Sequence, residues 1–340
     1  MGSMRIAVVN SSTFGLVFPK HTAMLKRLGK VTRHELPPRL SGAALARRLG
    51  DPEIVVSSVS PLYDDEFFAH SPGLILVTRH GIGYNNVDVR AAALHGVVVS
   101  RVPGPVEREA MAEHAVALIL ATSRRLFPAA AAVRAGKWAR RMDFVGIEMK
   151  GRTVGLVGCG NIGSRVAEIL SFGFGSRVLA CDPEVSAFAM RRCGAEKTTL
   201  ARVLRESDAI SLHASLNPAS RGMIGKRELA AMRPWVVLVN NARGELLDEV
   251  AVAKALRSGR LAGLGVDVIA REPAGADHPL LKCPNTVIVP HIGAYTRESL
   301  EAMGDKVVED VTRAVRGPGM PREVVNPEVF RNKELRWGKR

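Results

Sequence analysis

A glycine-rich segment near the middle of the chain constrains the fold more than any other feature. Gly158, Gly160 and Gly163 stand at its first, third and sixth positions, and Asn161 and Ile162 open a helical pattern after the apolar run 153–157. In this context the first glycine permits a tight turn, the second lets the backbone approach a pyrophosphate, and the third lets helix and strand pack closely. The free N–H groups at the helix start attract phosphate. The segment therefore predicts a strand–loop–helix unit that binds a dinucleotide.

An aspartate stands where such a unit contacts the ribose of its ligand. Asp182 follows Gly163 by 19 residues and ends the next apolar run. Its carboxylate can accept hydrogen bonds from the ribose hydroxyls and would repel a 2′-phosphate, so the spacing favours NAD over NADP. The alternative is a glycine turn followed by an unrelated aspartate in a loop.

Short apolar runs alternate with helical patterns along the 340 residues, a length typical of two domains. Such alternation predicts an α/β fold with parallel sheets covered by helices. The Pro-Gly-Pro sequence at 103–105 is typical of a loop and indicates a domain boundary. Strands are expected at 5–9, 54–56, 74–78, 97–99, 153–157, 177–181, 209–212, 236–240, 264–268 and 286–289, and helices at 22–28, 43–49, 89–95, 109–126, 162–172, 200–205, 249–258 and 297–316.

Charge and composition limit the partners of the chain. The formal net charge is +15, but the arginine pairs are spread along the sequence, so no focused basic stripe indicates a nucleic acid. The longest strongly apolar stretch, 115–121, is far shorter than the roughly 20 residues that cross a bilayer. The four cysteines form no Cys-x-x-Cys pair, so we expect neither a metal site nor a redox motif. We expect a reduced, cytoplasmic protein that contacts neither nucleic acid nor membrane.

Side chains capable of chemistry follow three apolar runs in the second half of the chain. Arg243 follows one run, Asp267 lies at the end of the next with Glu272 shortly after it, and His291 follows the last. Because the carboxyl ends of parallel strands meet at one edge of a sheet, these side chains can converge on one crevice. A guanidinium suits carboxylate oxygens, an imidazole exchanges protons near neutral pH, and a neighbouring carboxylate orients that ring. Each alone is typical of a surface ion pair, a packed histidine or a turn, whereas the combination predicts a catalytic site.

The chain resembles the D-isomer-specific 2-hydroxyacid dehydrogenases from Met4 to about Glu323. The resemblance implies an NAD-dependent enzyme that interconverts a D-2-hydroxy acid and its 2-oxo acid. The matching segments are the glycine loop, Asn-x-Ala-Arg-Gly at 240–244, Asp…Glu-Pro at 267–273, Pro-His-Ile-Gly at 290–293, Ala-Glu-His-Ala at 112–115 and Gly-Ile-Gly-Tyr-Asn-Asn-Val-Asp at 81–88.

The resemblance also implies a role for each candidate residue. Arg243 would bind the substrate carboxylate and polarise the 2-oxo group, His291 would exchange a proton with the carbonyl oxygen, and Glu272 would orient His291. Asp267 would hold the nicotinamide carboxamide, and no metal is implied. The remaining residues are assigned to the cofactor site (Ala242, Gly293) and to the substrate loops (Ser58, Arg79, Gly81, Ile82).

The architecture implied by the resemblance has two α/β domains, one of them discontinuous. A Rossmann-type doubly wound parallel sheet would bind the cofactor over 102–296. A smaller flavodoxin-like α/β substrate domain would comprise 4–101 and 297–330, followed by a basic tail at 331–340. The helix at 109–126 is similar to the dimer-forming region of the family, so a homodimer is expected. His114 and His213 are expected to be structural, and Cys159 to pack inside the glycine loop.

Departures from the family pattern bear on the substrate. Ser57 precedes Ser58 where phosphoglycerate dehydrogenases usually carry an arginine, which favours a small 2-oxo acid such as glyoxylate, hydroxypyruvate or pyruvate. Asn85 stands where aspartate is usual, and residues 214–215 differ in the loop beside the adenine. The alternatives are a D-3-phosphoglycerate dehydrogenase without a regulatory domain and a dinucleotide-sensing interaction protein similar to the C-terminal-binding corepressors.

Overall fold

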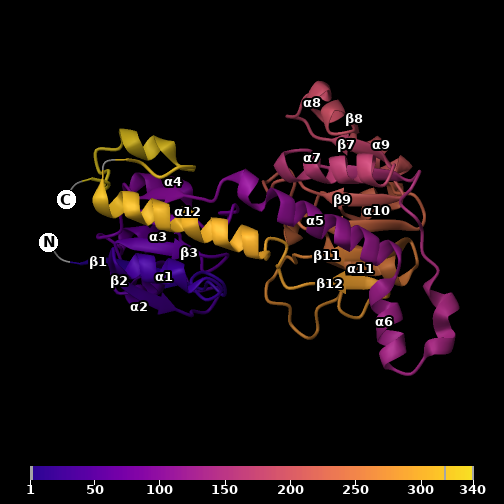
Figure 1. Ribbon diagram of the computed structural model, residues 1–340, viewed down its shortest axis with the longest axis horizontal. Coiled ribbons are helices and arrows are strands. Elements are labelled where there is room, and N and C mark those ends of the chain that lie inside the picture. The colour runs from indigo at the N-terminus through magenta and orange to yellow at the C-terminus, as the bar shows by residue number, and fades with distance from the viewer. Residues whose placement is uncertain (1–2, 318, 339–340) are drawn as a thin grey trace. The chain divides into compact units, whose positions relative to one another are not determined.

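The computed structural model describes residues 3–317 and 319–338. The chain divides into two compact units (Figure 1): one runs to Glu107 and resumes at Thr296, and the other is Arg108–Tyr295. The sequence places the two crossings at 102 and 297 instead. The first crossing lies inside a helix, because α5 spans Gly104–Ser123.

The first unit is built on a five-stranded parallel sheet of order β2-β1-β3-β4-β5, the order of flavodoxin-like folds. Alternate side chains of its central strands enter two apolar clusters, one on each face, which explains why these strands read as continuous apolar runs. Its elements are β1 (Met4–Val9), α1 (Pro19–Lys26), β2 (Gly29–His34), α2 (Gly42–Leu49), β3 (Ile54–Ser57), α3 (Asp65–Ala69), β4 (Leu76–Arg79), α4 (Val89–Leu94), β5 (Val98–Ser100), α12 (Arg297–Arg316) and η4 (Pro327–Arg331).

The segment after η4 belongs to this unit. Leu335 and Trp337 pack against the cluster formed by β1, β3, β4 and α12. Arg336 donates through Nη1 to the carbonyl of Ser71 at 2.7 Å. The sequence predicts a basic tail at 331–340, of which 339–340 lie outside the described residues. Residues 335–337 instead pack on the first unit.

The second unit contains a seven-stranded parallel sheet of order β12-β11-β10-β9-β6-β7-β8. Counted from β6, this is the doubly wound 3-2-1-4-5-6 order of Rossmann folds with one further strand. The fold class predicted from the sequence is thus confirmed for both units. The elements are α5, α6 (Leu126–Arg134), η1 (Trp138–Phe144), β6 (Thr153–Val157), α7 (Asn161–Glu168), η2 (Ile169–Gly173), β7 (Arg177–Cys181), α8 (Ala187–Arg192), β8 (Ala195–Lys197), α9 (Leu200–Glu206), β9 (Ala209–Leu212), α10 (Lys226–Ala231), β10 (Val236–Asn240), η3 (Gly244–Leu246), α11 (Glu249–Arg257), β11 (Leu261–Val266) and β12 (Thr286–Ile288).

The structure differs from the sequence expectation in two local features. The loop expected at 103–105 ends at Pro103, because α5 begins at Gly104. Pro105 is accommodated there since the first turn of a helix needs no N–H donor from it. Strands β2 and β8 were not expected, because both are mostly polar edge strands without an apolar run.

Among the described residues, no single helix has the length and apolar composition of a membrane span. The pair α5 and α6, bent by 61° at their junction, passes that test only when taken together.

Candidate active site

The glycine loop lies at the point where the strand order of the second sheet reverses, between β6 and its neighbours β7 and β9. Gly158 has φ +95°, and a Cβ there would lie 2.6 Å from the carbonyl carbon of His213. A Cβ on Gly163 would lie 2.3 Å from the carbonyl oxygen of Gly158. A Cβ on Gly160, in contrast, would meet open space beside the start of α7. This cradle fits the pyrophosphate of a dinucleotide, as the sequence predicts.

Asp182 holds the glycine loop against the end of β7. Its Oδ2 accepts the N–H of Cys159 at 2.8 Å, and its Oδ1 accepts those of Glu184 at 2.9 Å and Val185 at 3.2 Å. A carboxylate has about four acceptor positions, so capacity remains for a ribose hydroxyl. Asp182 therefore shapes the loop, and its role as a ligand of the ribose hydroxyls stays a prediction.

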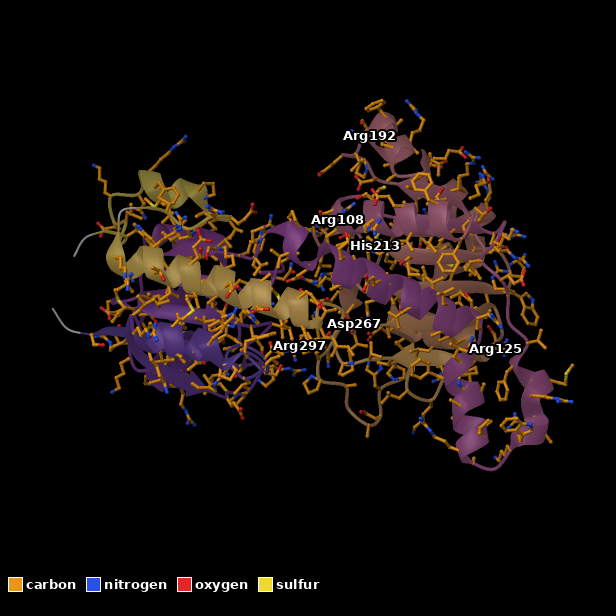
Figure 2. The ribbon with its side chains drawn as sticks, viewed as in Figure 1. Arg108, Arg125, Arg192, His213, Asp267 and Arg297 are labelled. Carbon is orange, nitrogen blue, oxygen red and sulfur yellow. The ribbon has the colours of Figure 1, made fainter. Side chains whose placement is uncertain are left out.

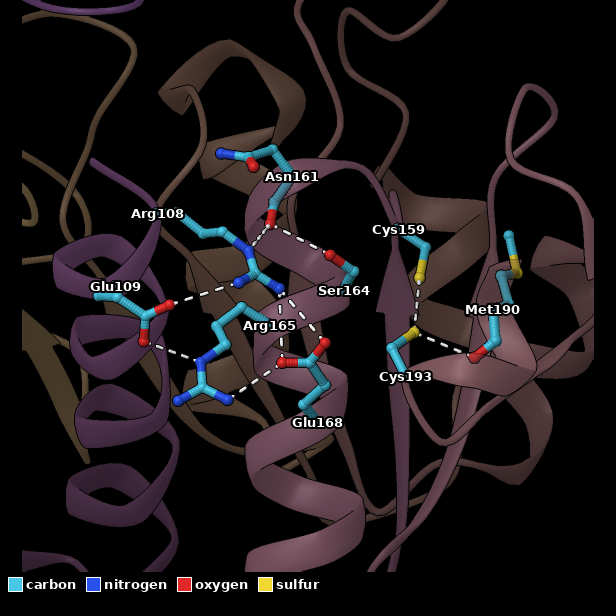
Figure 3. Close-up of polar contacts among 9 residues, drawn as sticks. All are labelled: Arg108, Glu109, Cys159, Asn161, Ser164, Arg165, Glu168, Met190 and Cys193. Carbon is cyan, nitrogen blue, oxygen red and sulfur yellow. Dashed lines mark hydrogen bonds and ion pairs between the residues drawn. The ribbon is translucent and has the colours of Figure 1, made fainter. Parts of the chain in front are cut away.

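A ring of alternating charges fixes the first turns of α7 to α5 (Figure 3). Arg108 donates through Nε to the carbonyl of Asn161 at 3.1 Å and through Nη2 to Glu168 at 3.3 Å. Arg165 donates to Glu109 at 2.8 Å and to Glu168 at 3.0 Å. These contacts orient the helix whose N-terminus faces the phosphate position.

The thiol of Cys159 in the glycine loop packs against the thiol of Cys193, which follows α8. The Sγ of Cys159 lies 4.0 Å from the Sγ of Cys193, which donates to the carbonyl of Met190 at 3.0 Å (Figure 3). Burial, reinforced by Cys193 and Asp182, raises the pKa of Cys159 to about 12. The thiol therefore stays protonated and serves as an apolar packing group.

The candidate catalytic residues follow three neighbouring strands of the second sheet. Arg243 follows β10, Asp267 follows β11 and His291 follows β12, and these strands are adjacent in the order β12-β11-β10. Asn240 shapes the loop before Arg243, because its Oδ1 accepts the N–H of Ala242 at 3.0 Å and its Nδ2 donates to the carbonyl of Arg243 at 2.8 Å. The structure thus brings these residues to one edge of the sheet.

His291 is oriented by Glu272, as the resemblance implies. The Nδ1 of His291 lies 2.8 Å from Oε2 of Glu272, and both side chains are about one third exposed. The backbone of His291 has φ +54°, a conformation that few residues other than glycine adopt. Its N–H donates to the carbonyl of Asp267 at 2.9 Å. The ring is therefore set by both its carboxylate partner and the neighbouring strand end.

Asp267 is a buried anion with several donors. Its oxygens accept the N–H groups of Ile292 at 2.7 Å and Gly293 at 2.9 Å, and the Nε2 of His114 lies 3.4 Å from Oδ1 (Figure 2 shows where Asp267 lies). Burial raises the pKa of Asp267, but His114 and the two backbone donors outweigh burial and leave the pKa below its ordinary value. Asp267 thus anchors the segment after His291, and its assignment to the nicotinamide stays a prediction.

The substrate-loop candidates lie at the carboxyl ends of β3 and β4 in the first unit. The carbonyl of Ser58 accepts a bond from Asn86 at 3.0 Å. Arg79 is buried and donates through Nη1 to the carbonyl of His80 at 2.5 Å, so its guanidinium stabilises the backbone of the loop after β4. Gly81 and Ile82 follow, with Gly81 at φ +142°.

The sequence does not predict one residue that contacts this loop. Glu107, in the first turn of α5, accepts the N–H of Ile82 on Oε1 at 3.1 Å. No motif signals this contact, because the two residues are 25 positions apart and meet only in the folded unit. Among the described residues, no group of three or more histidine, cysteine or acidic side chains is arranged to hold a metal ion.

Comparison with known proteins places the chain in a family. A family model described as D-isomer specific 2-hydroxyacid dehydrogenase, NAD binding domain, matches residues 116–293. Glyoxylate reductase of Korarchaeum cryptofilum is 37% identical over 302 residues, which cover 88% of this chain and 90% of that protein. D-3-phosphoglycerate dehydrogenase of Mycobacterium leprae is 42% identical over 272 residues, 78% of this chain but 51% of that protein, so the chain spans about half of its length. The crystal structure of the TT0316 protein of Thermus thermophilus has a TM-score of 0.83 and 33% identity, covering 94% of this chain and 99% of that one.

The fold and the site define an α/β oxidoreductase that binds a nicotinamide dinucleotide. The chain belongs to the D-isomer-specific 2-hydroxyacid dehydrogenase family. The family, the fold class and the enzymatic class predicted from the sequence are therefore confirmed. The named relatives act on different acids, so they support the general reaction more strongly than any one substrate.

Proposed function

We propose that the protein interconverts a small 2-oxo acid and its D-2-hydroxy acid, with Arg243, Glu272 and His291 as its catalytic residues. The observation that carries the proposal is the His291–Glu272 pair, 2.8 Å apart, at the same sheet edge as Arg243. An imidazole held by a carboxylate on one nitrogen presents the other nitrogen for proton exchange.

Each residue has a distinct task in the proposed reaction. A bound nicotinamide supplies or accepts the hydride at carbon 2 of the acid. Arg243 pairs with the substrate carboxylate and draws electron density from the 2-oxo group. The Nε2 of His291 donates a proton to the carbonyl oxygen during reduction and removes it during oxidation, while Glu272 stabilises the imidazolium. Asp267, Ala242 and Gly293 line the nicotinamide side, and Ser58, Arg79, Gly81 and Ile82 form the substrate loops.

We further propose that the protein prefers NAD over NADP through Asp182. The Asp182 carboxylate, fixed by three backbone N–H groups, would repel a 2′-phosphate on the ribose. Asp182→Asn removes the charge and keeps an acceptor oxygen. We expect the ratio of kcat/KM for NADH to that for NADPH to fall at least about tenfold, since like charges a few ångströms apart repel by about 1–4 kcal/mol. An unchanged ratio would remove Asp182 from cofactor selection.

Glyoxylate, hydroxypyruvate and pyruvate-like acids are the proposed substrates. Support comes from the similarity to a glyoxylate reductase over nearly the full length of both chains. Ser57, at the position where phosphoglycerate dehydrogenases usually carry an arginine, is fully buried. A D-3-phosphoglycerate dehydrogenase activity remains the second candidate, favoured by the 42% identity to the mycobacterial enzyme.

The test is a panel of 2-oxo acids assayed by the loss of NADH absorbance. Turnover of glyoxylate, hydroxypyruvate or pyruvate supports the proposal, whereas preferred turnover of 3-phosphohydroxypyruvate supports the second candidate. Tight NADH binding without turnover of any acid would contradict both and indicate a dinucleotide-sensing interaction protein similar to the C-terminal-binding corepressors.

The protein is also proposed to be a cytoplasmic homodimer that contacts neither nucleic acid nor membrane. Support for the dimer is a series of exposed apolar side chains on α6, η1 and the residue after η1. They are Leu126, Phe127, Val133, Trp138, Met142 and Val145. Figure 1 shows α6 and the segment after it projecting from the sheet of the second unit. Such an exposed apolar patch is typical of a surface that another chain covers.

A further inference from the structure

The carboxylate of Glu107 accepts the backbone N–H of Ile82, one of the residues proposed to contact the substrate. Oε1 of Glu107 lies 3.1 Å from the backbone nitrogen of Ile82, and Glu107 is only 8% exposed. The resemblance to the D-isomer-specific 2-hydroxyacid dehydrogenases implies that the N–H groups of this loop bind the carboxylate of a 2-oxo acid together with Arg243. Any anionic substrate that approaches Ile82 therefore meets the negative charge of Glu107.

The parts of the loops that directly follow β1, β3 and β4 carry no charged side chain. Residues 10–18, 58–62 and 80–87, which follow β1, β3 and β4, contain no aspartate, glutamate, lysine or arginine. Asp64, further along the loop after β3, caps the start of α3 by accepting the N–H of Phe67 at 2.9 Å. Arg33, on β2, donates to the backbone carbonyls of Ser11 and Phe14 in the loop after β1. Burial, together with the charges of Arg79 and His21, lowers the pKa of His80 to about 3, so this histidine is neutral. Arg79, at the end of β4, is buried and directs Nη1 at the backbone carbonyls of Ser57 and His80.

The same loops expose aliphatic side chains. The loop after β1 exposes Leu16 and Val17, and the loop after β3 exposes Val59 and Leu62, each between 40% and 58%. Strands β1 and β3 are neighbours in the first sheet, so both loops leave it at the same carboxyl edge. Ligands of open α/β sheets bind at this edge. An aliphatic substrate tail gains free energy against such a surface. A phosphate or second carboxylate finds no cation within these segments, and Arg33 beside the first of them already donates to the carbonyls of Ser11 and Phe14.

We propose that Glu107 is a specificity-determining residue that restricts the enzyme to 2-oxo acids with a single negative charge and an uncharged, preferably aliphatic, tail. The inference rests on the proposed 2-oxo acid reduction and refines its substrate class. Glu107 acts in two ways: its carboxylate competes with the substrate carboxylate for the Ile82 N–H, and its charge repels a second anionic group. Selection arises from this repulsion as much as from attraction to the aliphatic loops.

The experiment measures kcat/KM for four acids with the wild type and with Glu107→Gln. Pyruvate and 4-methyl-2-oxopentanoate carry one charge, and 2-oxoglutarate and 3-phosphohydroxypyruvate carry more. We expect the wild type to favour the singly charged acids by at least about a hundredfold, which corresponds to two tenfold steps of about 1.4 kcal/mol each. Glutamine keeps an acceptor oxygen for the Ile82 N–H, so Glu107→Gln is expected to lower KM for all four acids. It should also reduce the preference for singly charged acids about tenfold.

Two further variants control the experiment. Glu113→Gln makes the same change on an exposed position of α5 and should leave the preference unaltered. Leu62→Arg places a cation on the aliphatic surface and should raise kcat/KM for 3-phosphohydroxypyruvate without altering the affinity for NADH. Thermal unfolding of each variant shows that the fold is retained.

The outcomes separate this inference from the function on which it rests. No turnover of any acid by the wild type overturns the proposed function and this inference with it. Wild-type turnover without preference for the singly charged acids overturns the inference alone. A higher KM for every acid in Glu107→Gln also overturns it, because Glu107 would then be a brace that holds the loop in place.

Discussion

At the scale of single residues, the catalytic candidates are positioned mainly by backbone groups of neighbouring strand ends. The N–H of His291 donates to the carbonyl of Asp267, and the carboxylate of Asp267 accepts the next two N–H groups along the chain. A left-handed φ in a residue other than glycine costs of order 1–3 kcal/mol, so His291 keeps it only because these contacts enforce it. The ring direction therefore depends on Asp267 as well as on Glu272.

Removing the proposed acid should affect turnover rather than binding. We expect His291→Asn to lower kcat about 10²–10⁴-fold, the usual contribution of a general acid–base group, with KM and NADH affinity nearly unchanged. His278→Asn is the matched control, because His278 forms a similar pair with Glu249 at 3.2 Å in the same unit. Steady-state kinetics and NADH titration check both variants. Near wild-type turnover in His291→Asn would show that another group transfers the proton.

The sequence predicts these residues by type and by position after a strand, but it does not predict their contacts. Arg243, Glu272 and His291 each follow an apolar run, so topology alone brings them to one edge. The contact between Glu107 and Ile82 depends instead on how a helix start packs on a distant loop. Such contacts leave no periodic signal in the chain.

At the scale of elements, the sequence predicts best the strands that are buried on both faces and the helices that bury one continuous apolar face. The bounds of β6, β10 and α12 agree with the sequence expectation, because each has a long apolar pattern between clear stops. The helix start at Gly104 and the edge strand β2 were not predicted, because a proline-rich segment and a polar run are compatible with several local structures.

The docking of α12 on the first sheet depends on a buried charged pair. Asp310 accepts bonds from Lys306, from Ser100 at 2.5 Å and from Thr78 at 3.0 Å, and it is 1% exposed. Burial raises the pKa of Asp310 and lowers that of Lys306, so each charge depends on its partner.

Breaking this pair on one side should destabilise the first unit more than removing both charges. We expect Asp310→Ala to lower the free energy of unfolding by about 3–5 kcal/mol, because it leaves the Lys306 ammonium buried without its counter-ion. The double variant Asp310→Leu with Lys306→Met should recover most of that loss. Urea unfolding of the three proteins tests this expectation, and equal destabilisation by the single and double variants would contradict it.

At the scale of the whole molecule, two histidines with lowered pKa values, one in each unit, couple folding to pH. Burial lowers the pKa of His80 to about 3 in the first unit and that of His213 to about 4 in the second. In the unfolded chain both have pKa values near 6.5, so below that pH the unfolded state binds more protons. The free energy of unfolding should therefore fall as the pH drops from 6.5 towards 4.

The contribution of one histidine can be isolated with a variant. His80→Phe removes a group whose share in this pH dependence is at most about 1.4 kcal/mol per pH unit. Between pH 6.5 and 5, the variant should lose stability less steeply than the wild type in urea titrations. Parallel curves for the two proteins would mean that the pKa of His80 is the same in the folded and unfolded states.

The exposed apolar segment on α6 and η1 predicts the assembly of the molecule. We expect sedimentation to give twice the chain mass of 36.6 kDa for the wild type.

Trp138 and Met142 are more than 70% exposed, so replacing both by aspartate should cost little stability in the single chain while placing two charges on the proposed contact surface. The double variant should therefore sediment as a monomer and still bind NADH. Phe188 is an apolar residue on α8 that is 65% exposed, and the Phe188→Asp variant should remain dimeric, since α8 lies outside that segment. A monomeric wild type, or a dimer that tolerates both aspartates, would place the association surface elsewhere.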